Sequence, residues 1–478
     1  MKKYLLAVLF ILLIGITSAY ATYVYTAREI SYTPEDQTWN VDNVQDAINE
    51  LKVSCSNNSS STGNCNCTAN ISKPSLGEGM LPVTIADDGT VTYISDNDAN
   101  WYDYCNKKWA NSVILVDTPS KTYNVGDTIS ESDIRIYLVY IPKYKYKLWN
   151  VGVNDDIYGP QEIDIVFDNI NTTDVEGVSC ATPLTSGASG NCNNGEYMTH
   201  PAFITLNKNG FWVSKFEVGY MGATSTSAAQ VNSSDSTKII AKPNTYSWRN
   251  ITVYNAFVAS YNLNRNLDTH MIKNTEWGAV AYLSHSRYGV DNEININNNS
   301  AYITGKSALN TKMNNTYPGE YGNDNTYNSN YNTINGYRAS TTGNISGIYD
   351  MSGGSWEYMS SYRSETLGSS GFTTSNIASY DSKYFDIYNA SSAQTTYQYR
   401  ILGDATGEMG PIKYYKDADE SQRYHNWYGD NSVFVDSSAP WFLRGGGSNN
   451  GGLAGAFYFV RDVGTTYTGS SFRLVLSV

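Results

Sequence analysis

Short stretches of alternating apolar and polar residues fill the chain between about residues 80 and 170. Strict alternation over a few residues is the period of a half-buried strand. Gly, Asn, Asp and Pro separate the stretches, as is typical of turns. The pattern predicts a small β-rich domain over residues 76–195, with strands at 81–85, 91–94, 112–116, 134–141 and 161–167.

A helical period joins the strands from about residue 196 onward. Residues 253–263 and 272–284 place apolar side chains three and four positions apart, which predicts two amphipathic helices. Asn274 is the expected N-cap of the second helix. The strand pattern continues at 211–218, and 347–359 reads as a strand, a double-glycine turn and an aromatic strand. Residues 196–478 are therefore expected to form a second, α+β domain.

The last segment, residues 441–478, has two strand-like ends and a glycine-rich middle. It opens with an apolar run into Arg444 and three glycines, and it closes with an alternating strand at 472–476. Glycines between the ends permit turns with positive φ. We expect the two ends to belong to a rigid scaffold and the middle to face solvent, which is how many folds present a binding surface.

The N-terminus carries an export signal. Lys2 and Lys3 precede an apolar run over residues 5–16, and Ser18-Ala19-Tyr20-Ala21 follows it. Small residues after a short apolar core are typical of a cleavable signal peptide. The run is also long enough to be retained as a membrane anchor. Residues 1–25 are interpreted as one or the other, and both place the protein outside the cell.

A short helix and a linker are expected between this signal and the first domain. Val44, Ala47, Ile48 and Leu51 form one helical stripe within residues 26–51. Residues 52–75 are rich in Ser, Asn and Cys, which is the composition of a linker. A helix of this length needs a partner to be stable, so self-association through residues 1–51 is a second hypothesis for this region.

Composition narrows the class of protein. Among 478 residues, only 16% are charged and 41 are tyrosine. The net charge of −13 argues against a general nucleic-acid binder. Tyr, Ser, Gly and Asn are the residues that paratopes favour, because they combine contact area with adaptable hydrogen bonding. Residues 290–335 and 361–440 are polar and tyrosine-rich, and we expect them to be long surface excursions.

The cysteine count is even, which is compatible with disulfides in an exported protein. Cys180 and Cys192 bracket a short polar loop and are the preferred pair. Metal binding is the alternative, but there is no C-x-x-C pair and the four histidines are scattered. The pairing of the others is left open: Cys55, Cys65, Cys67 and Cys105.

Several pieces of the second half, taken in order, resemble the sulfatase-modifying, formylglycine-generating-enzyme-like branch of the C-type lectin fold. The resemblance implies a C-type-lectin-like fold for residues 196–478. The strings that carry it are FWVSKFEV at 211–218, NITVYNAFVASYNL at 250–263, MIKNTEWGAVAYL at 271–283, GIYDMSGGSWEYM at 347–359, WFLRGGG at 441–447 and SFRLVL at 471–476.

The chemistry of that family is not implied. Its oxidase activity needs a cysteine pair late in the domain to hold copper, and this chain has no cysteine after Cys192. A formylglycine-generating type of oxidase is therefore a disfavoured alternative. Asp350 and Glu357 flank the double-glycine turn and have the residue types of an acid/base pair, but charged residues at such a turn more often anchor it. We expect no enzymatic activity.

The C-terminal segment also looks like the variable region of proteins diversified by retroelements in gut bacteria. In those proteins chosen positions vary on a lectin-like scaffold and become a ligand-binding surface. Gly447 and Ser448 stand where tryptophans commonly follow the RGG element, which departs from the pattern. Matched onto this chain, the implied contact residues are Ser448, Asn449, Asn450, Leu453, Tyr458, Val460, Arg461, Asp462, Thr465, Thr466 and Tyr467.

Arg444 and Arg473 each lie within an apolar strand, and a buried guanidinium must be paired. The carboxylates available in the same core pieces are Glu217, Glu276 and Glu357, so at least one structural ion pair is expected among them. Trp277 and Trp356 are also interpreted as structural residues.

The sequence thus predicts a non-enzymatic, extracellular ligand-binding or adhesion protein whose partner is a protein or a carbohydrate on another cell or a phage. A structural subunit of a pilus-like filament is the alternative. No cofactor is expected beyond a structural calcium ion, since lectin-like folds often hold one with oxygen ligands. Asp291, Asn292 and Glu293 are the candidates by ligand type.

Overall fold

The computed structural model describes residues 71–147, 162–167, 198–308, 329–388 and 427–478. All of them fall within one compact unit, which runs from Thr68 to Val478. The predictions for residues 1–25, for the helix and linker that follow, and for Cys55, Cys65, Cys67, Cys180 and Cys192 lie outside the described residues. Cys105 is described and is disulfide-bonded.

The largest element is an antiparallel sheet of eight strands in the order β12-β20-β9-β5-β3-β1-β2-β4. It contains four of the five strands predicted in the first half, each to within one residue at either end, and it extends into the second half. Its members are β1 (Met80–Ile85), β2 (Val91–Tyr93), β3 (Asn111–Leu115), β4 (Thr128–Ile129), β5 (Ile134–Pro142), β9 (Gly210–Ser214), β12 (His270–Met271) and β20 (Leu474–Leu476). The strand predicted at 161–167 is present as the shorter β7 (Asp164–Phe167), in another sheet.

This sheet crosses the expected domain boundary at residues 195/196. Strand β5 pairs with β9, with Leu138 opposite Ser214 and Ile141 opposite Phe211. Apart from Arg135, every residue of β5 is buried. A strand buried on both faces belongs in the centre of a sheet and not at the edge of a small separate domain. The two expected domains are therefore one continuous structure.

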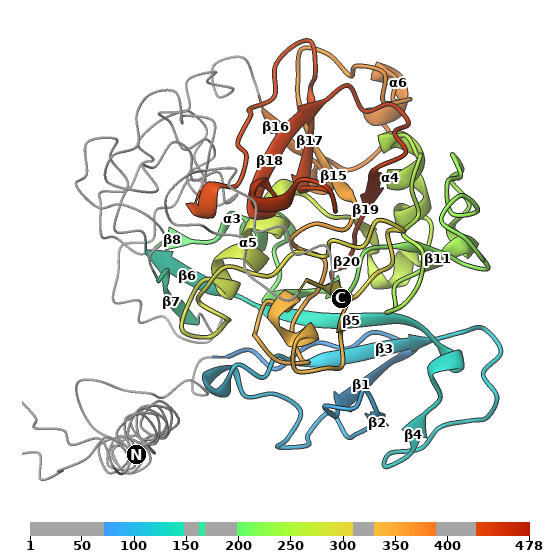
Figure 1. Cartoon of the computed structure of the whole chain (residues 1–478), viewed down its shortest axis with the longest axis vertical. Helices are drawn as coiled ribbons and strands as arrows, with labels where there is room; N and C mark the ends of the chain where they lie inside the picture. Colours follow the sequence, from blue (N-terminus) through green and yellow to red (C-terminus); the bar gives the residue numbers. More distant parts are fainter. Residues whose placement is uncertain (1–70, 148–161, 168–197, 309–328, 389–426) are drawn as a thin grey trace, which may run out of the picture. The chain divides into compact units, whose positions relative to one another are not determined.

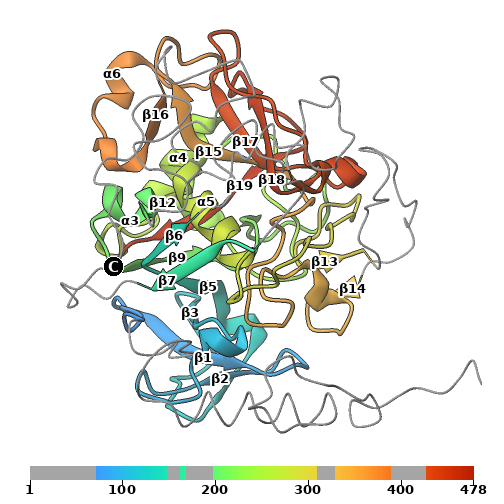
Figure 2. The ribbon, with the colours of Figure 1, turned by 90° about the vertical axis from the view of Figure 1, so that its left-hand side faces the viewer.

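A second sheet is formed by later parts of the chain, in the order β16-β15-β17-β18, with β19 also pairing with β15. Strand β15 runs parallel to β16 and β19 and antiparallel to β17. Figures 1 and 2 show this sheet above the long one. Its members are β15 (Trp356–Arg363), β16 (Asp386–Tyr388), β17 (Trp441–Gly445), β18 (Gly455–Asp462) and β19 (Ser470–Phe472).

Both expected helices are present, as α4 (Val253–Tyr261) and α5 (Asn274–Ser284). In Figure 2 they lie between the two sheets. All residues of α5 are buried, so it is a core helix and not an amphipathic surface helix. Its N-cap is Lys273 and not Asn274, because the Lys273 backbone N–H donates to the Glu276 carboxylate at 2.8 Å. Two shorter helices are α3 (Pro201–Leu206) and α6 (Thr374–Ile377).

The hydrophobic core has two main parts, one on each face of the long sheet. Leu138 and Trp212 of the sheet pack with Phe257 of α4 and Trp441 of β17 in the larger part. Tyr137 faces the other way, into a cluster under residues 331–349. This alternation along β5 is the ordinary consequence of the two-residue strand period.

One three-stranded sheet and two strand pairs make up the remaining β-structure of the described residues. Strand β6 (Tyr144–Lys147) pairs with β7 (Asp164–Phe167) and β8 (Met198–Thr199). Two further pairs are β10 (Gly219–Tyr220) with β11 (Ile239–Ile240) and β13 (Lys306–Ser307) with β14 (Ser329–Asn330). No helix among the described residues is long and apolar enough to span a bilayer.

Three predictions about connecting segments were wrong. Residues 347–355 contain no strand, because Asp350, Gly353 and Gly354 all have positive φ and turn the chain instead. Part of the 290–335 excursion is interior, since Glu293, Ile294, Asn295, Ile296 and Asn297 are buried. The start of the 361–440 excursion is also ordered into α6 and β16.

Candidate functional site

A buried charged cluster lies under the double-glycine turn. Arg473, in the break between β19 and β20, binds the Glu357 carboxylate of β15 at two points: Nη2 to Oε1 at 2.6 Å and Nε to Oε2 at 2.9 Å. The same guanidinium donates to the carbonyl oxygens of Ser214 and Tyr349, each at 3.0 Å. The expected structural ion pair is thus present, and it joins both sheets to the turn.

The turn itself is fixed by two further carboxylates. Asp350 accepts from the Gly305 backbone N–H at 2.9 Å and from the Asn297 amide at 2.8 Å. Glu217 accepts from the Ser355 backbone N–H at 2.7 Å. A Cβ on Gly354 would lie only 2.3 Å from a Glu217 oxygen, so this approach requires glycine.

The electrostatics of the cluster are unusual because it holds three buried carboxylates for one guanidinium. Burial, together with the nearby Asp350 and Glu357, raises the pKa of Glu217 well above its ordinary value. Burial also raises the pKa of Asp350, against the opposing effect of Arg473. Glu357 and Asp350 are 0% and 1% exposed. Asp350 and Glu357, whose residue types suit an acid/base pair, are therefore enclosed by the protein and do not face solvent.

Arg444 and Trp277 form a second buried contact, beneath β17 and β18. The Arg444 Nη1 donates to the Asn274 side-chain oxygen at 3.0 Å, and its guanidinium lies 5.7 Å from the Trp277 ring centre. The Trp277 indole N–H donates to the Ala456 carbonyl at 2.7 Å. Glu276, one of the expected carboxylate partners, instead bonds His270 at 2.9 Å. Trp277, Glu276 and Arg444 are each 0% exposed, and a structural role for them stays a prediction.

Trp356, at the start of β15, was expected to be structural but lies partly at the surface. It is half-buried, although its neighbours from Met351 to Tyr362 are buried. A Cβ on Gly447 or Gly469 would lie 2.8 Å or 2.5 Å from its ring. The indole therefore rests on two glycine backbones, and it fills the space that a side chain at position 447 would need.

Trp356 brings the two ends of the expected variable segment together. Its ring centre is 5.7 Å from that of Tyr467, which is 49% exposed. Beside Gly447, Asn449 is exposed and Ser448 is half-buried, and beside Tyr467, Thr466 is half-buried. We call this group of side chains the Trp356 surface: Trp356, Ser448, Asn449, Thr466 and Tyr467.

The backbone under the Trp356 surface is held by hydrogen bonds on both sides. The Ser448 N–H donates to the Gly354 carbonyl at 2.8 Å, and the Gly447 N–H donates to the Asn450 side chain at 2.7 Å. The Tyr467 carbonyl accepts from the Asn250 N–H at 3.0 Å. Fixed backbone with outward side chains is the arrangement expected of a preorganised binding surface.

The structure does not place all the predicted contact residues on this surface. Tyr458 is 3% exposed, and its hydroxyl accepts the Trp356 indole N–H at 2.9 Å, so it supports the surface from below. Arg461 is exposed but lies on the opposite face of β18 from Tyr458, because successive strand residues alternate. Arg461 pairs there with Asp436.

The remaining predicted contact residues are not part of the Trp356 surface as defined above. Asp462 accepts from the Tyr358 hydroxyl at 2.7 Å, and the same hydroxyl donates to the Thr465 carbonyl at 2.7 Å, so both residues fix the end of β18. Asn450, Leu453, Val460 and Thr465 are half-buried. The predicted contact residues within β18 are therefore divided between its two faces, because successive residues of a strand point to opposite faces.

The calcium candidates are adjacent in the chain but do not converge. Asn292 accepts from the Glu293 backbone N–H at 2.8 Å, and Glu293 is buried whereas Asn292 is exposed. Across the part of the chain that the structure describes, no group of three or more His, Cys, Asp or Glu side chains is placed to hold a metal ion.

Comparison of the chain with protein-family models and with curated proteins found no match.

Proposed function

We propose that this protein is a non-enzymatic, extracellular ligand-binding or adhesion protein that uses the Trp356 surface for recognition. The observation that carries the proposal is the half-buried Trp356 indole, seated on Gly447 and Gly469 beside the exposed Tyr467. A rigid aromatic platform with amide and hydroxyl groups at its edge offers both stacking area and hydrogen bonds at low entropic cost.

The surface fits the scaffold that the sequence resembles. Helices α4 and α5 and strands β9, β15, β17, β19 and β20 coincide with the pieces similar to the formylglycine-generating-enzyme-like branch of the C-type lectin fold. The α+β arrangement is compatible with that fold. The absence of any cysteine after Cys192 favours binding over the oxidase activity of the family.

Export is part of the proposal. The apolar run over residues 5–16 and the disulfide of Cys105 both favour an oxidising, extracellular location. The partner is a protein or a carbohydrate on another cell or a phage. A pilus-like filament, assembled through residues 1–51, remains the alternative, and filaments lost on deletion of those residues would favour it.

A binding experiment with matched variants tests the proposal. The labelled full chain is incubated with bacterial and mammalian cells and measured by flow cytometry. We expect saturable binding to at least one cell type and at least a tenfold loss in the double variant Asn449→Ala/Tyr467→Ala. The control Asn266→Ala/Ile334→Ala removes an exposed amide and an exposed apolar side chain elsewhere. Absence of binding, or equal binding by both variants, contradicts the proposal.

Diversification of the segment by a retroelement is the more specific form of the same proposal. The varied positions would be the outward ones at Ser448, Asn449, Thr466 and Tyr467, while buried Tyr458 would be constrained. Sequencing the DNA downstream of the gene tests this form. A near-copy of the last hundred or so bases that differs at adenines, beside a reverse-transcriptase gene, is the expected finding.

A further inference from the structure

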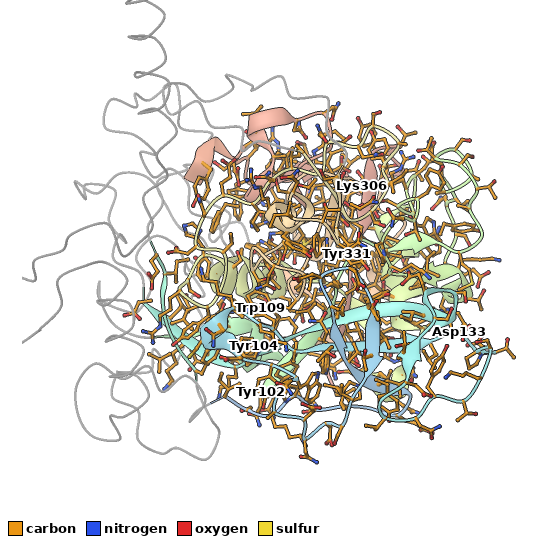
Figure 3. The ribbon with its side chains drawn as sticks, turned by 60° about the horizontal axis from the view of Figure 1, so that its bottom comes forward. Tyr102, Tyr104, Trp109, Asp133, Lys306 and Tyr331 are labelled. Carbon is orange, nitrogen blue, oxygen red and sulfur yellow. The ribbon has the colours of Figure 1, made fainter. Side chains whose placement is uncertain are left out.

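A pocket of about 640 Å³ opens on the long sheet, away from the residues of the Trp356 surface. Three segments far apart in the sequence line it: the end of β1 with Asp87, residues 99–111, and residues 344–346. Figure 3 shows Tyr102, Tyr104 and Trp109 grouped on this side of the molecule. Its volume is within the range of small-molecule binding sites.

The floor of the pocket is rigid. Asn111 of β3 donates from its side-chain amide to the Trp109 carbonyl at 2.9 Å and to the Ser346 carbonyl at 2.8 Å. Its side-chain oxygen accepts from the buried Lys215 ammonium at 3.0 Å. The Trp101 indole N–H donates to the Asn111 backbone carbonyl at 2.8 Å. These bonds fix the Trp101 indole, the Trp109 backbone and the 344–346 wall before any ligand arrives.

The wall that carries Tyr102 is fixed as well. The Tyr102 ring packs against those of Trp101 and Tyr104, at centre distances of 5.7 Å and 5.9 Å. Asp103 caps the next turn by accepting from the Asn106 backbone N–H at 3.2 Å, and it also accepts from the Asn106 side-chain amide at 2.6 Å. Cys105, within that turn, is disulfide-bonded. The aromatic contacts and the disulfide therefore hold this wall in place.

The rim offers hydrogen-bonding groups that the described residues leave unused. The side-chain polar atoms of Tyr102, Asn100 and Lys108 line the pocket, and no hydrogen bond or ion pair within the described parts of the chain engages them. A phenol, an amide and an ammonium supply donors and acceptors together, and the half-buried Tyr102 ring is the aromatic face at the rim, since Trp101 and Trp109 are 1% and 0% exposed. This mixture suits a polyhydroxylated ring better than an apolar ligand.

Charge selects among such ligands. Asp87 and Asp103 line the pocket against the single ammonium of Lys108, and the whole chain carries a net charge of −13. An anionic ligand would meet an excess of carboxylates, which disfavours phosphates and acidic sugars. The geometry points to a second binding site, in this pocket, for a short neutral saccharide. This site shares no residue with the Trp356 surface, so the two proposals stand or fail separately.

Ligand-observed NMR on the full chain tests the inference. The probes are four neutral trisaccharides (maltotriose, cellotriose, xylotriose and triacetylchitotriose), with sialyllactose and a trimer of galacturonic acid as acidic comparators. We expect saturation transfer to at least one neutral trisaccharide. Asn100→Ala should weaken this binding about tenfold, and Ala99→Trp should abolish it by filling the pocket, because Ala99 is exposed at its rim.

The variant Asn449→Ala/Tyr467→Ala is the matched control, since it alters only the Trp356 surface. It should bind the trisaccharide as well as the unmodified chain does. The inference is overturned if no neutral trisaccharide binds, if an acidic one binds more tightly, or if binding survives Ala99→Trp. Loss of binding in the control variant would assign the saccharide to the Trp356 surface and would likewise overturn the pocket.

Discussion

The rings of Trp356 and Tyr467 lie 5.7 Å apart, and one is half-buried whereas the other is half-exposed. Trp356 begins β15, and Tyr467 precedes β19, the strand that pairs with it. The contact therefore joins the scaffold to the segment that the sequence predicts to be variable.

The contact between the Trp356 indole and the glycine backbone can be tested by substituting Gly469. A Cβ there would lie 2.5 Å from the ring, so Gly469→Ala must displace Trp356. Overpacking of this kind costs about 1–3 kcal/mol of unfolding free energy, measured by urea denaturation. In a Trp356→Leu background the same substitution should cost much less, because residues in contact are not additive. Equal costs in the two backgrounds would show that the ring is not the obstacle.

The buried ion pair predicts a large effect at Arg473. The substitution Arg473→Ala removes the guanidinium and leaves the Glu357 carboxylate buried without a cation. This typically lowers the free energy of unfolding by about 3–5 kcal/mol. We expect loss of cooperative thermal unfolding, monitored by circular dichroism. Arg461→Ala is the control, because its side chain is 42% exposed and such substitutions stay within about 0.5 kcal/mol. A well-folded Arg473→Ala protein would disprove the role assigned to the pair.

Glu217 predicts a pH dependence. In the unfolded chain this carboxyl ionises near its ordinary pKa of 4.5, but burial holds the pKa well above that value in the folded protein. The stability that it contributes is therefore present below pH 4.5 and is lost as the pH rises through the folded-state pKa. Glu217→Gln cannot ionise and keeps the shape of the side chain.

Urea denaturation of the two proteins between pH 4.5 and pH 8 measures this effect. The stability of Glu217→Gln relative to the unmodified protein should increase as the pH rises. A constant difference, or one that shrinks with rising pH, would mean that Glu217 is ionised in the folded state without cost.

The disulfide of Cys105 predicts a difference in chemical reactivity. In the unfolded but unreduced protein, iodoacetamide should leave Cys105 unmodified, and alkylation should appear only after reduction. Peptide mass spectrometry of the secreted chain measures this directly and also identifies the partner cysteine. Alkylation without reduction would remove the support that this bond gives to an extracellular location.

Local patterns predicted the elements well, and the tertiary arrangement explains where they failed. The strands of the first half and both helices were found because their periods are regular. The boundary at residue 195 was wrong because the partner of β5, strand β9, lies about seventy residues later in the chain. No local pattern reports such a pairing.

The candidate site was only partly predictable for a similar reason. An ion pair of Arg473 could be predicted from the sequence, since a charge inside an apolar strand requires a partner. The choice of Glu357 over Glu217 and Glu276 came only from the structure.

The position of Trp356 at the surface could not be predicted from the sequence. It depends on two glycines, Gly447 and Gly469, that lie more than ninety residues away along the chain. Gly447 and the glycines before Trp356 were the features of the sequence that pointed to a close backbone approach near this side chain. Tyr458 was predicted as a contact residue but is 3% exposed, because it lies on the inward face of β18.

The central claim is that a fixed scaffold carries a freely variable recognition surface. The test is a library displayed on cells in which four positions are fully randomised: Ser448, Asn449, Thr466 and Tyr467. The library is sorted once for folded expression, which tests the scaffold, and once for binding to the target cells, which tests the surface. The account predicts that most substitutions keep expression at the level of the unmodified chain while most abolish binding. Loss of expression across the library, or binding that is indifferent to these four positions, would contradict it.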